Sequence, residues 1–314
     1  MFLNTTGYYI PQTRVPNAYF LEVNGLTDEW IFQRTGIKTR SKATEEETMD
    51  RMSIEAVRQA IPQLPYSIKE VDLIIFASYT PTDTVATTAH IIQREFEMDH
   101  AKAFLLSSAC SSAINSIEII QAFMATGKAS KALLLSADRN STYTNESDPK
   151  AGHLWGDAAV ALFFSKERYR QQEAQIIDVD TQGLGHVGKG PGGVYLRPKT
   201  EGIRMPDGRD VFMQACTYIA KNTEDMLAKN GYTIADLSYF ISHQANMRIV
   251  ANVMKALNLP EEKVLCNIET LGNTGSVSSP LVLAQHINDF RPGDLVCLTV
   301  FGGGYSSGVC LLKF

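Results

Sequence analysis

The strongest constraint on the fold is a similarity between two parts of the chain that lie 166 residues apart. The segment YSIKEVDLIIF, which begins at Tyr66, resembles YTIADLSYFIS, which begins at Tyr232. Gly127 and Gly293 keep the same separation, and each stands just before an apolar run that is predicted to form a buried strand. One such match could arise by chance, but several at one separation indicate two similar halves. We expect these halves to meet around a shared site.

Apolar runs and amphipathic segments alternate along the chain, which predicts an α/β protein. The segment 66–80 holds a strand that is apolar on both faces, as is typical of strands inside a parallel sheet, and further strands are predicted over 131–138 and 155–164. Amphipathic helices are predicted over 48–61 and 210–230. We therefore expect largely parallel, buried sheets, with residues 1–165 in the N-terminal half and 166–314 in the C-terminal half.

The segment 105–123, LLSSACSSAINSIEIIQAF, predicts a buried strand that turns sharply into a helix at Cys110. A thiol at a helix N-terminus is expected to favour the thiolate. Its small neighbours would let a substrate approach and would leave backbone N–H groups open to a developing oxyanion. A buried structural cysteine is the common alternative, and this segment alone leaves both interpretations open.

The composition excludes several classes of protein. A net charge of -5 and a pI near 5.7 argue against nucleic acid as a general partner. No apolar run has membrane-spanning length, and no signal peptide is expected, because Met1 leads directly into a strand-like segment. The five cysteines have no closely spaced pair, which predicts neither a disulfide frame nor a zinc site and favours a reducing, cytoplasmic location.

A glycine-rich stretch lies between the halves. Gly188, Gly190 and Gly193 formally match the G-x-G-x-x-G pattern of dinucleotide-binding proteins. Pro191 lies within it, and no amphipathic helix follows directly, so we interpret the stretch as a loop.

Two polar motifs in the second half complete a candidate catalytic site. SHQAN places His243 at the end of a predicted strand, and GNTGS places Asn273 in a tight turn. Taken singly, a structural histidine and a turn asparagine are the common interpretations. Together with Cys110 in the other half, they suggest a Cys/His/Asn site.

The segment 27–40, TDEWIFQRTGIKTR, predicts a helix with Trp30 and Arg34 on one face. The pair is either a surface tryptophan packed on an arginine stem or a flat, cationic clamp for an adenine ring.

SACSS around Cys110, SHQANMRI around His243, GNTGS around Asn273 and the terminal FGGGYSSG resemble the β-ketoacyl-acyl carrier protein synthase III family, which belongs to the thiolase-like superfamily. TDEWIFQRTGIKTR and WGDAAVALFF are similar to further landmarks of that family, so the resemblance runs from end to end. It implies a five-layered αβαβα fold made of two similar halves, in agreement with the internal similarity.

The resemblance also implies a reaction, the decarboxylative condensation that starts fatty acid synthesis. Cys110 would take an acyl group from coenzyme A as a thioester, with the backbone N–H groups of Cys110 and Gly303 as the oxyanion hole. His243 and Asn273 would donate hydrogen bonds to the thioester carbonyl of malonyl-acyl carrier protein, which loses carbon dioxide and attacks the acyl-cysteine. No metal and no permanently bound cofactor are implied, and the coenzyme A thioester is a substrate.

Further residues are implied by the same resemblance. Trp30 and Arg34 match the adenine clamp, and Phe212 matches a residue that lines the pantetheine tunnel. The acidic carrier protein would need a local basic patch, for which we expect Arg248 and Lys255, seven residues apart on a predicted helix. An ordinary solvated helix face is the alternative for that pair.

Three positions depart from the family pattern. Ser112 stands where many members have a glycine, and Arg209 replaces a polar amide near the tunnel. Val85 falls where family members that favour short primers carry an aromatic, which crosses the interface of the expected homodimer and narrows the acyl pocket. These departures leave the acyl specificity open.

Two other functions are compatible with parts of this pattern. An acyltransferase or condensing enzyme of a secondary-metabolite pathway is possible on the same fold, although such relatives often have an altered Asn site. A non-catalytic subunit of a heterodimer would usually lack the cysteine, so the retained Cys110, His243 and Asn273 argue against it.

Overall fold

A computed structural model describes residues 1–314, and nine of its strands form one mixed sheet in the order β11-β12-β13-β8-β1-β7-β6-β4-β5. These strands are β1 (Phe2–Tyr9), β4 (Leu73–Ala77), β5 (Lys102–Leu106), β6 (Lys131–Arg139), β7 (Asp157–Ser165), β8 (Ala174–Gly183), β11 (Tyr239–Ser242), β12 (Leu295–Gly302) and β13 (Ser306–Lys313). The order β5-β4-β6-β7-β1 in the first half matches β11-β12-β13-β8 in the second, except that the second half lacks a full outer strand. The halves join where β1 pairs with β8.

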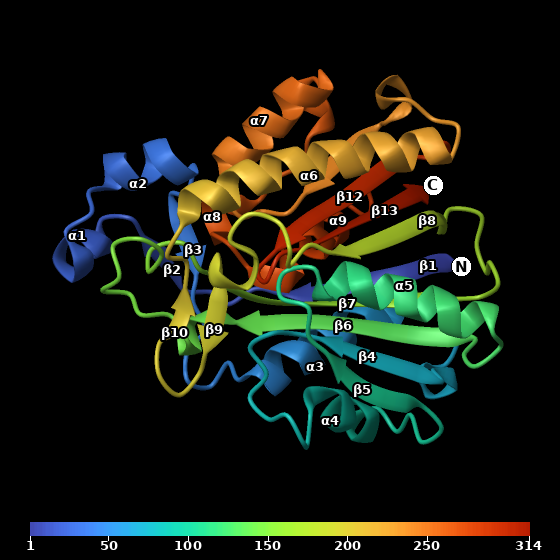
Figure 1. Cartoon of the computed structure of the whole chain (residues 1–314). Coiled ribbons are helices and arrows are strands. Elements are labelled where there is room, and N and C mark those ends of the chain that lie inside the picture. Colours follow the sequence, from blue (N-terminus) through green and yellow to red (C-terminus); the bar gives the residue numbers. More distant parts are fainter.

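Helices cover both faces of each half of the sheet, which produces five layers (Figure 1). One outer layer contains α3 (Met49–Ala60) and α4 (Thr88–Glu95), and the other contains α6 (Gly208–Lys229) and α7 (Met247–Leu257). The middle layer contains α5 (Ser112–Ala125) and α9 (Ser278–Gln285), which pack between the two halves in the largest apolar cluster. This arrangement confirms the expected αβαβα fold.

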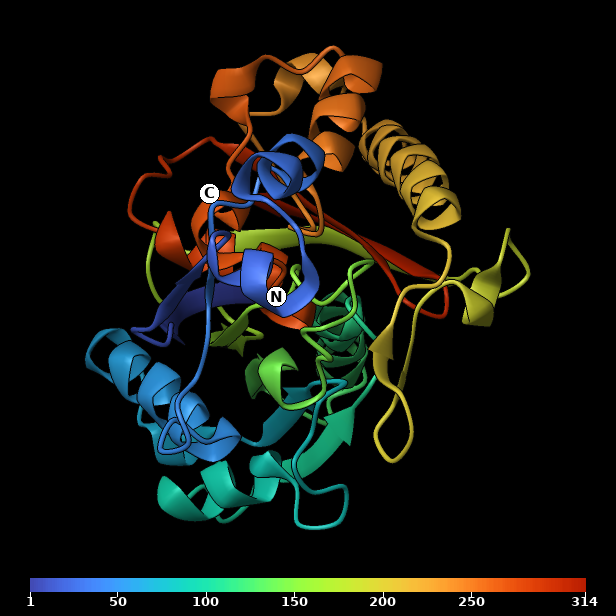
Figure 2. The same ribbon diagram turned by 90° about the vertical axis from the view of Figure 1, so that its left-hand side faces the viewer.

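The remaining elements are short. They are α1 (Tyr19–Asn24), α2 (Asp28–Thr35), α8 (Ile268–Leu271), the strands β2 (Arg14–Pro16), β3 (Thr39–Ser41), β9 (Tyr195–Arg197) and β10 (Gly202–Arg204), and single 3₁₀ turns at Ile61–Gln63, Ile68–Glu70, Asn140–Thr142, Gly190–Gly192, Ile234–Asp236, Glu261–Lys263 and Gly275–Val277. The helices α1 and α2 and the β9–β10 hairpin lie at the end of the molecule that faces the viewer in Figure 2.

The expectation of largely parallel sheets is wrong. The β4–β5, β4–β6 and β11–β12 pairs are parallel, but β7 runs antiparallel to both β1 and β6, and β13 runs antiparallel to both of its neighbours. Every residue of β7 is nevertheless buried. An apolar run on both faces therefore indicates that both faces are covered by helices, and it does not indicate strand direction.

Local signals explain why the predicted elements form where they do. The apolar positions Ala113, Ile117, Ile120 and Met124 all lie on the buried face of α5, as their spacing predicts.

None of the helices is both long and apolar enough to span a membrane.

Candidate active site

Cys110 lies at a sharp bend between a strand and a helix. The strand β5 ends at Leu106, α5 begins at Ser112, and Ala109 has a φ of 49°, in the left-handed region. A non-glycine residue in that region costs about 1 kcal/mol, so the bend must be held by other contacts. The Ser112 hydroxyl accepts from the Ser108 N–H at 2.8 Å and donates to the Ala109 carbonyl at 2.6 Å. The serine that departs from the family pattern therefore stabilises the bend.

The expectation of a stabilised thiolate at Cys110 is not met. Burial raises the pKa of the Cys110 thiol to about 12, and the negative charge of Asp138 raises it further. The backbone N–H groups of Gly303 and of Cys110 itself lower the pKa, but they do not offset the burial. The resting residue is thus a thiol, and two backbone donors face its sulfur.

Cys110 opens into a cavity of about 360 Å³. The cavity walls are mostly apolar and come from both halves of the chain: Tyr79, Trp155, Pro191, Val194, Tyr195, Leu196 and Ile203, with Gly303 and Gly304 beside the sulfur. The glycine-rich stretch supplies one wall and is a loop, as expected. Gly193 lies so close to Tyr305 that a Cβ atom would be 2.4 Å from its hydroxyl oxygen, so only glycine fits there.

His243 follows the last residue of β11 and is buried. Burial lowers the pKa of its imidazole to about 4, so the ring is neutral near pH 7. Its Nδ1 lies 2.5 Å from the Ser278 hydroxyl, at the start of α9. If the hydroxyl donates to Nδ1, the opposite nitrogen Nε2 carries the proton and can donate.

Asn273 lies in a tight turn that follows the short helix α8, and no strand leads into it. Its Oδ1 accepts from the Gly275 N–H at 3.0 Å, which leaves the NH₂ group free to donate elsewhere. Its backbone accepts from the Gly156 N–H at 2.9 Å and donates to the Leu154 carbonyl at 2.8 Å. The turn is thereby fixed against the first half, beside Trp155.

The second cavity is also about 360 Å³. Leu154 lines it, and the next residue, Trp155, lines the Cys110 cavity. Ala245 and Asn246, which follow His243 in sequence, line it as well. His243 and Asn273 themselves line neither cavity, but residues next to them in sequence or in contact with them do.

The sequence-predicted binding residues Trp30, Arg34, Phe212 and Arg248 all line the second cavity. The Arg34 guanidinium lies over the Trp30 ring, 4.2 Å from its centroid, and Arg248 lies over Phe212 at 5.7 Å. Arg209 and Lys150 add two further cations. None of the four cations forms an ion pair, so this cavity is suited to an anionic ligand.

Two predicted residues lie away from both cavities. Val85 lies in the loop before α4 and is 85% exposed, so within one chain it does not contact the Cys110 cavity. Lys255 is exposed on α7, outside the second cavity, whereas Arg248 on the same helix is exposed and lines it.

Sequence reasoning missed four residues. Tyr79 and Trp155 line the Cys110 cavity, and buried His153 stacks edge-on against Trp30 with ring centroids 5.7 Å apart. Asp138 is fully buried at the end of β6. Only Asp138 had a usable signal, since a carboxylate that closes the apolar run KALLLSAD must be compensated by donors.

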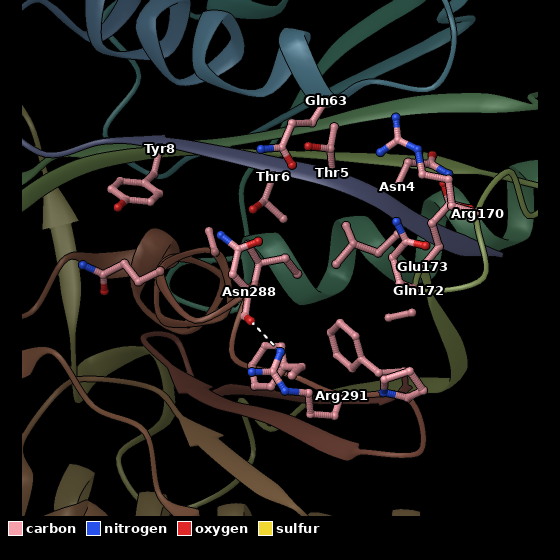
Figure 3. A pocket seen from close by; sticks show the side chains of 18 of the residues that line it. Asn4, Thr5, Thr6, Tyr8, Gln63, Arg170, Gln172, Glu173, Asn288 and Arg291 are labelled. Carbon is pink, nitrogen blue, oxygen red and sulfur yellow. Dashed lines mark hydrogen bonds between the residues drawn. The ribbon is translucent and has the colours of Figure 1, made fainter.

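A third cavity, of about 510 Å³, contains none of the predicted site residues (Figure 3). It is lined by residues of β1, by Gln59 and Gln63, by the segment around Glu173, and by side chains within 284–292 together with Phe314. Nowhere in residues 1–314 do three His, Cys, Asp or Glu side chains gather in a way that could hold a metal ion.

Comparison with known proteins gives matches along the whole chain. Residues 104–185 match the family described as 3-oxoacyl-[acyl-carrier-protein] synthase III, and residues 227–314 match its C-terminal part. The beta-ketoacyl-[acyl-carrier-protein] synthase III of Aquifex aeolicus (strain VF5) is 32% identical over 311 residues, which cover 98% of each chain.

Solved structures agree. The crystal structure of 3-oxoacyl-[acyl-carrier-protein] synthase III from Aquifex aeolicus VF5 has a TM-score of 0.93 at 32% identity, with 100% of this chain and 99% of that chain covered. The synthase III from Thermus thermophilus has the same TM-score at 29% identity and the same coverage.

Proposed function

The chain belongs to the 3-oxoacyl-[acyl-carrier-protein] synthase III family, and we propose that it joins an acyl group from coenzyme A to malonyl-acyl carrier protein through an acyl-Cys110 intermediate. It is an acyltransferase of the condensing type. The catalytic roles are assigned from one observation. The first half of the chain supplies the thiol of Cys110, and the second half supplies two neutral hydrogen-bond donors, His243 and Asn273.

The first step is acylation of Cys110. The sulfur attacks the thioester carbon of the acyl-coenzyme A, the bond to the coenzyme A sulfur breaks, and the thiol proton leaves with coenzyme A. The carbonyl oxygen gains negative charge in the transition state, and the N–H groups of Cys110 and Gly303 can donate to it. Because these donors belong to the rigid backbone, they need no reorganisation when the charge develops.

The second step begins with loss of carbon dioxide from the malonyl thioester. The electron pair of the broken C–C bond delocalises onto the thioester oxygen, to which Nε2 of His243 and Nδ2 of Asn273 donate. The resulting enolate carbon attacks the acyl-Cys110 carbonyl, and the C–S bond breaks. The sulfur takes up one proton from solvent, so the enzyme returns to its thiol form.

Neutral donors suit this step better than charged ones. A neutral imidazole holds its proton while the oxygen gains charge, and burial keeps His243 neutral near pH 7. The Gly275 N–H holds Oδ1 of Asn273 in the turn, and the NH₂ group of the side chain is left available to donate.

The second cavity is the proposed entrance for coenzyme A and for the carrier-protein arm. The Trp30 ring offers an aromatic face, Arg34, Lys150 and Arg209 offer cations for phosphate groups, and Phe212 offers an apolar wall. Arg34 already stacks on one face of Trp30, so an adenine must use the other face or displace the guanidinium. On α7, Arg248 and Lys255 are the proposed contacts for an acidic carrier protein.

A second copy of this chain is the proposed structural partner. The strand β5 is the outermost strand of the first half, and it pairs only with β4. Apolar side chains are half-buried on it and on α5: Phe104, Leu106, Ile119 and Phe123. Pairing of two β5 strands would satisfy the open backbone groups and cover this apolar surface. All five cysteines are free thiols, which supports the proposed cytoplasmic location.

The roles are tested by separating the two half-reactions. Intact-protein mass spectrometry after incubation with acyl-coenzyme A should show one acyl group on the peptide that contains Cys110, and Cys110→Ser should abolish it. His243→Ala and Asn273→Ala should keep acylation and lose condensation by about a hundredfold to a thousandfold, the usual effect of one lost oxyanion donor. A label on another cysteine, or near-normal condensation in both variants, would refute the assignment.

A further inference from the structure

Asp138 is a buried carboxylate that receives donors from both halves of the chain. Its Oδ1 accepts from first-half donors, namely the Ser78 hydroxyl at 3.0 Å, the Thr80 hydroxyl at 2.8 Å and the N–H groups of Tyr79 at 3.2 Å and Thr80 at 3.3 Å. Its Oδ2 accepts from Ser276 in the second half, from the N–H at 2.7 Å and the hydroxyl at 2.6 Å. Oδ1 is therefore hydrogen-bonded to the first half of the chain, and Oδ2 to the second half.

Only a carboxylate can accept all of these hydrogen bonds. An amide in the same place would keep one acceptor oxygen, and its NH₂ group could not accept from the backbone N–H groups on its side. The turn that contains Ser276 also fits closely against Asp138. Gly275 has a φ of 67°, and a Cβ atom there would lie 2.5 Å from Oδ2. The carboxylate and the glycine thus determine how closely this turn approaches the first half.

The same turn fixes Asn273, because the Gly275 N–H donates to Oδ1 of Asn273. We propose that Asp138 is a positioning residue for the condensation step: it holds the turn 273–276 against the strand ends that carry Tyr79, so that the Asn273 NH₂ group faces the acylated Cys110. This inference rests on the proposed role of Asn273 in that step.

Asp138 also acts on the thiol. The titratable groups that its charge reaches are Tyr79 and Cys110, and it raises the pKa of both. Removal of the charge should therefore lower the pKa of Cys110. A lower pKa of Cys110 distinguishes loss of the carboxylate charge from a general destabilisation of the fold. General destabilisation would not by itself lower that pKa.

The test compares Asp138→Asn with Asp157→Asn in the full-length enzyme. Asp157 is equally buried and accepts from the Ala43 N–H and from Ser141, all in the first half. Asp138→Asn should slow condensation by about a hundredfold, as expected for a misplaced catalytic group, and should keep Cys110 acylation within about fivefold of wild type. It should also lower the pH midpoint of Cys110 alkylation by iodoacetamide. Asp157→Asn should leave that midpoint and the ratio of the two half-reactions unchanged.

The inference would be overturned if Asp138→Asn lost acylation and condensation equally, or if it condensed at the normal rate. Either result would overturn it even if the pH midpoint of Cys110 alkylation had shifted. If Asp138→Asn does not fold, Ser276→Ala decides, because it removes one second-half donor and keeps the carboxylate. It should slow condensation without moving the alkylation midpoint, and unchanged condensation would overturn the inference. If Asn273→Ala itself condenses normally, the proposed function of Asn273 fails, whereas a normal Asp138→Asn beside an impaired Asn273→Ala refutes the role of Asp138 alone.

Discussion

At the scale of single residues, burial drives Cys110 and His243 toward neutrality from opposite directions. It raises the pKa of the thiol to about 12 and lowers the pKa of the imidazole to about 4. Near pH 7 the resting site therefore contains a thiol and a neutral ring, and not a thiolate–imidazolium pair. This state suits the proposed division of labour, in which the ring donates a proton that it already holds.

The neutral His243 has a consequence for stability that can be measured. In the unfolded chain this residue binds a proton as the pH falls through about 6.5, but in the folded chain it does so only near pH 4. The free energy of unfolding therefore decreases as the pH falls from about 6.5 to about 4. The unfolding free energy of wild type relative to His243→Gln should therefore fall by up to about 3 kcal/mol between pH 7 and pH 4. Urea unfolding at a series of pH values checks this, with half-exposed His286→Gln as the control. Parallel curves for wild type and His243→Gln would contradict the prediction.

At the scale of elements, α7 carries two cations with different surroundings. Arg248 lines the second cavity, and Lys255 lies outside it on the same helix. Lys255→Glu should raise the KM for malonyl-acyl carrier protein by about three- to tenfold and spare acylation from coenzyme A, as expected for a charge at the rim of a docking surface. Arg248→Glu should impair both substrates, because both would pass its side chain.

The control for this prediction is Lys128→Glu, an exposed lysine just after α5. Steady-state kinetics with each substrate varied in turn measure the effect. Equal KM values for wild type and Lys255→Glu would show that the carrier protein does not dock on this part of α7.

At the scale of the whole molecule, the two halves share capping details as well as strand order. Ser67 with Glu70 and Thr233 with Asp236 form capping boxes, and α5 and α9 begin at Ser112 and Ser278, all with the separation of 166 residues found in the sequence. We propose that the chain divides between β7 and β8, into residues 1–165 and 166–314.

Features that depend on residues close together in sequence could be predicted, and features that depend on distant residues could not. Turns, caps and helix faces depend on neighbours a few residues away, so the bend at Cys110 and the buried face of α5 were predicted. Strand direction depends on pairing across the sheet, and it was predicted wrongly. Asp138 meets Ser276 across 138 residues, so no local pattern could assign that contact. The pKa of Cys110 was likewise missed, because its burial is produced by walls from both halves.

At the same scale, the proposed dimer determines how Val85 could affect the choice of acyl group. Val85 is exposed, so it can affect an acyl pocket only in the partner subunit of the proposed dimer. Val85→Phe should shift acylation from medium-length acyl-coenzyme A toward acetyl-coenzyme A by more than about tenfold, since each excluded methylene represents about 0.8 kcal/mol. Val85→Ala is the control and should not exclude longer acyl groups. Competition between acetyl- and hexanoyl-coenzyme A, read by mass spectrometry, measures the shift, and an unchanged ratio for Val85→Phe would contradict the prediction.

The two outer ends of the sheet differ in a way that limits how many copies can assemble. Beyond β11 the second half has no further strand and only a single bridge, between Phe240 and Val264. Beyond β5 the first half offers a complete row of backbone donors and acceptors. A sheet that could grow at both ends would polymerise into a filament, but this one has a single end on which another copy can add. If two copies pair symmetrically through β5, as proposed, that end is occupied and no third chain can add to the sheet there.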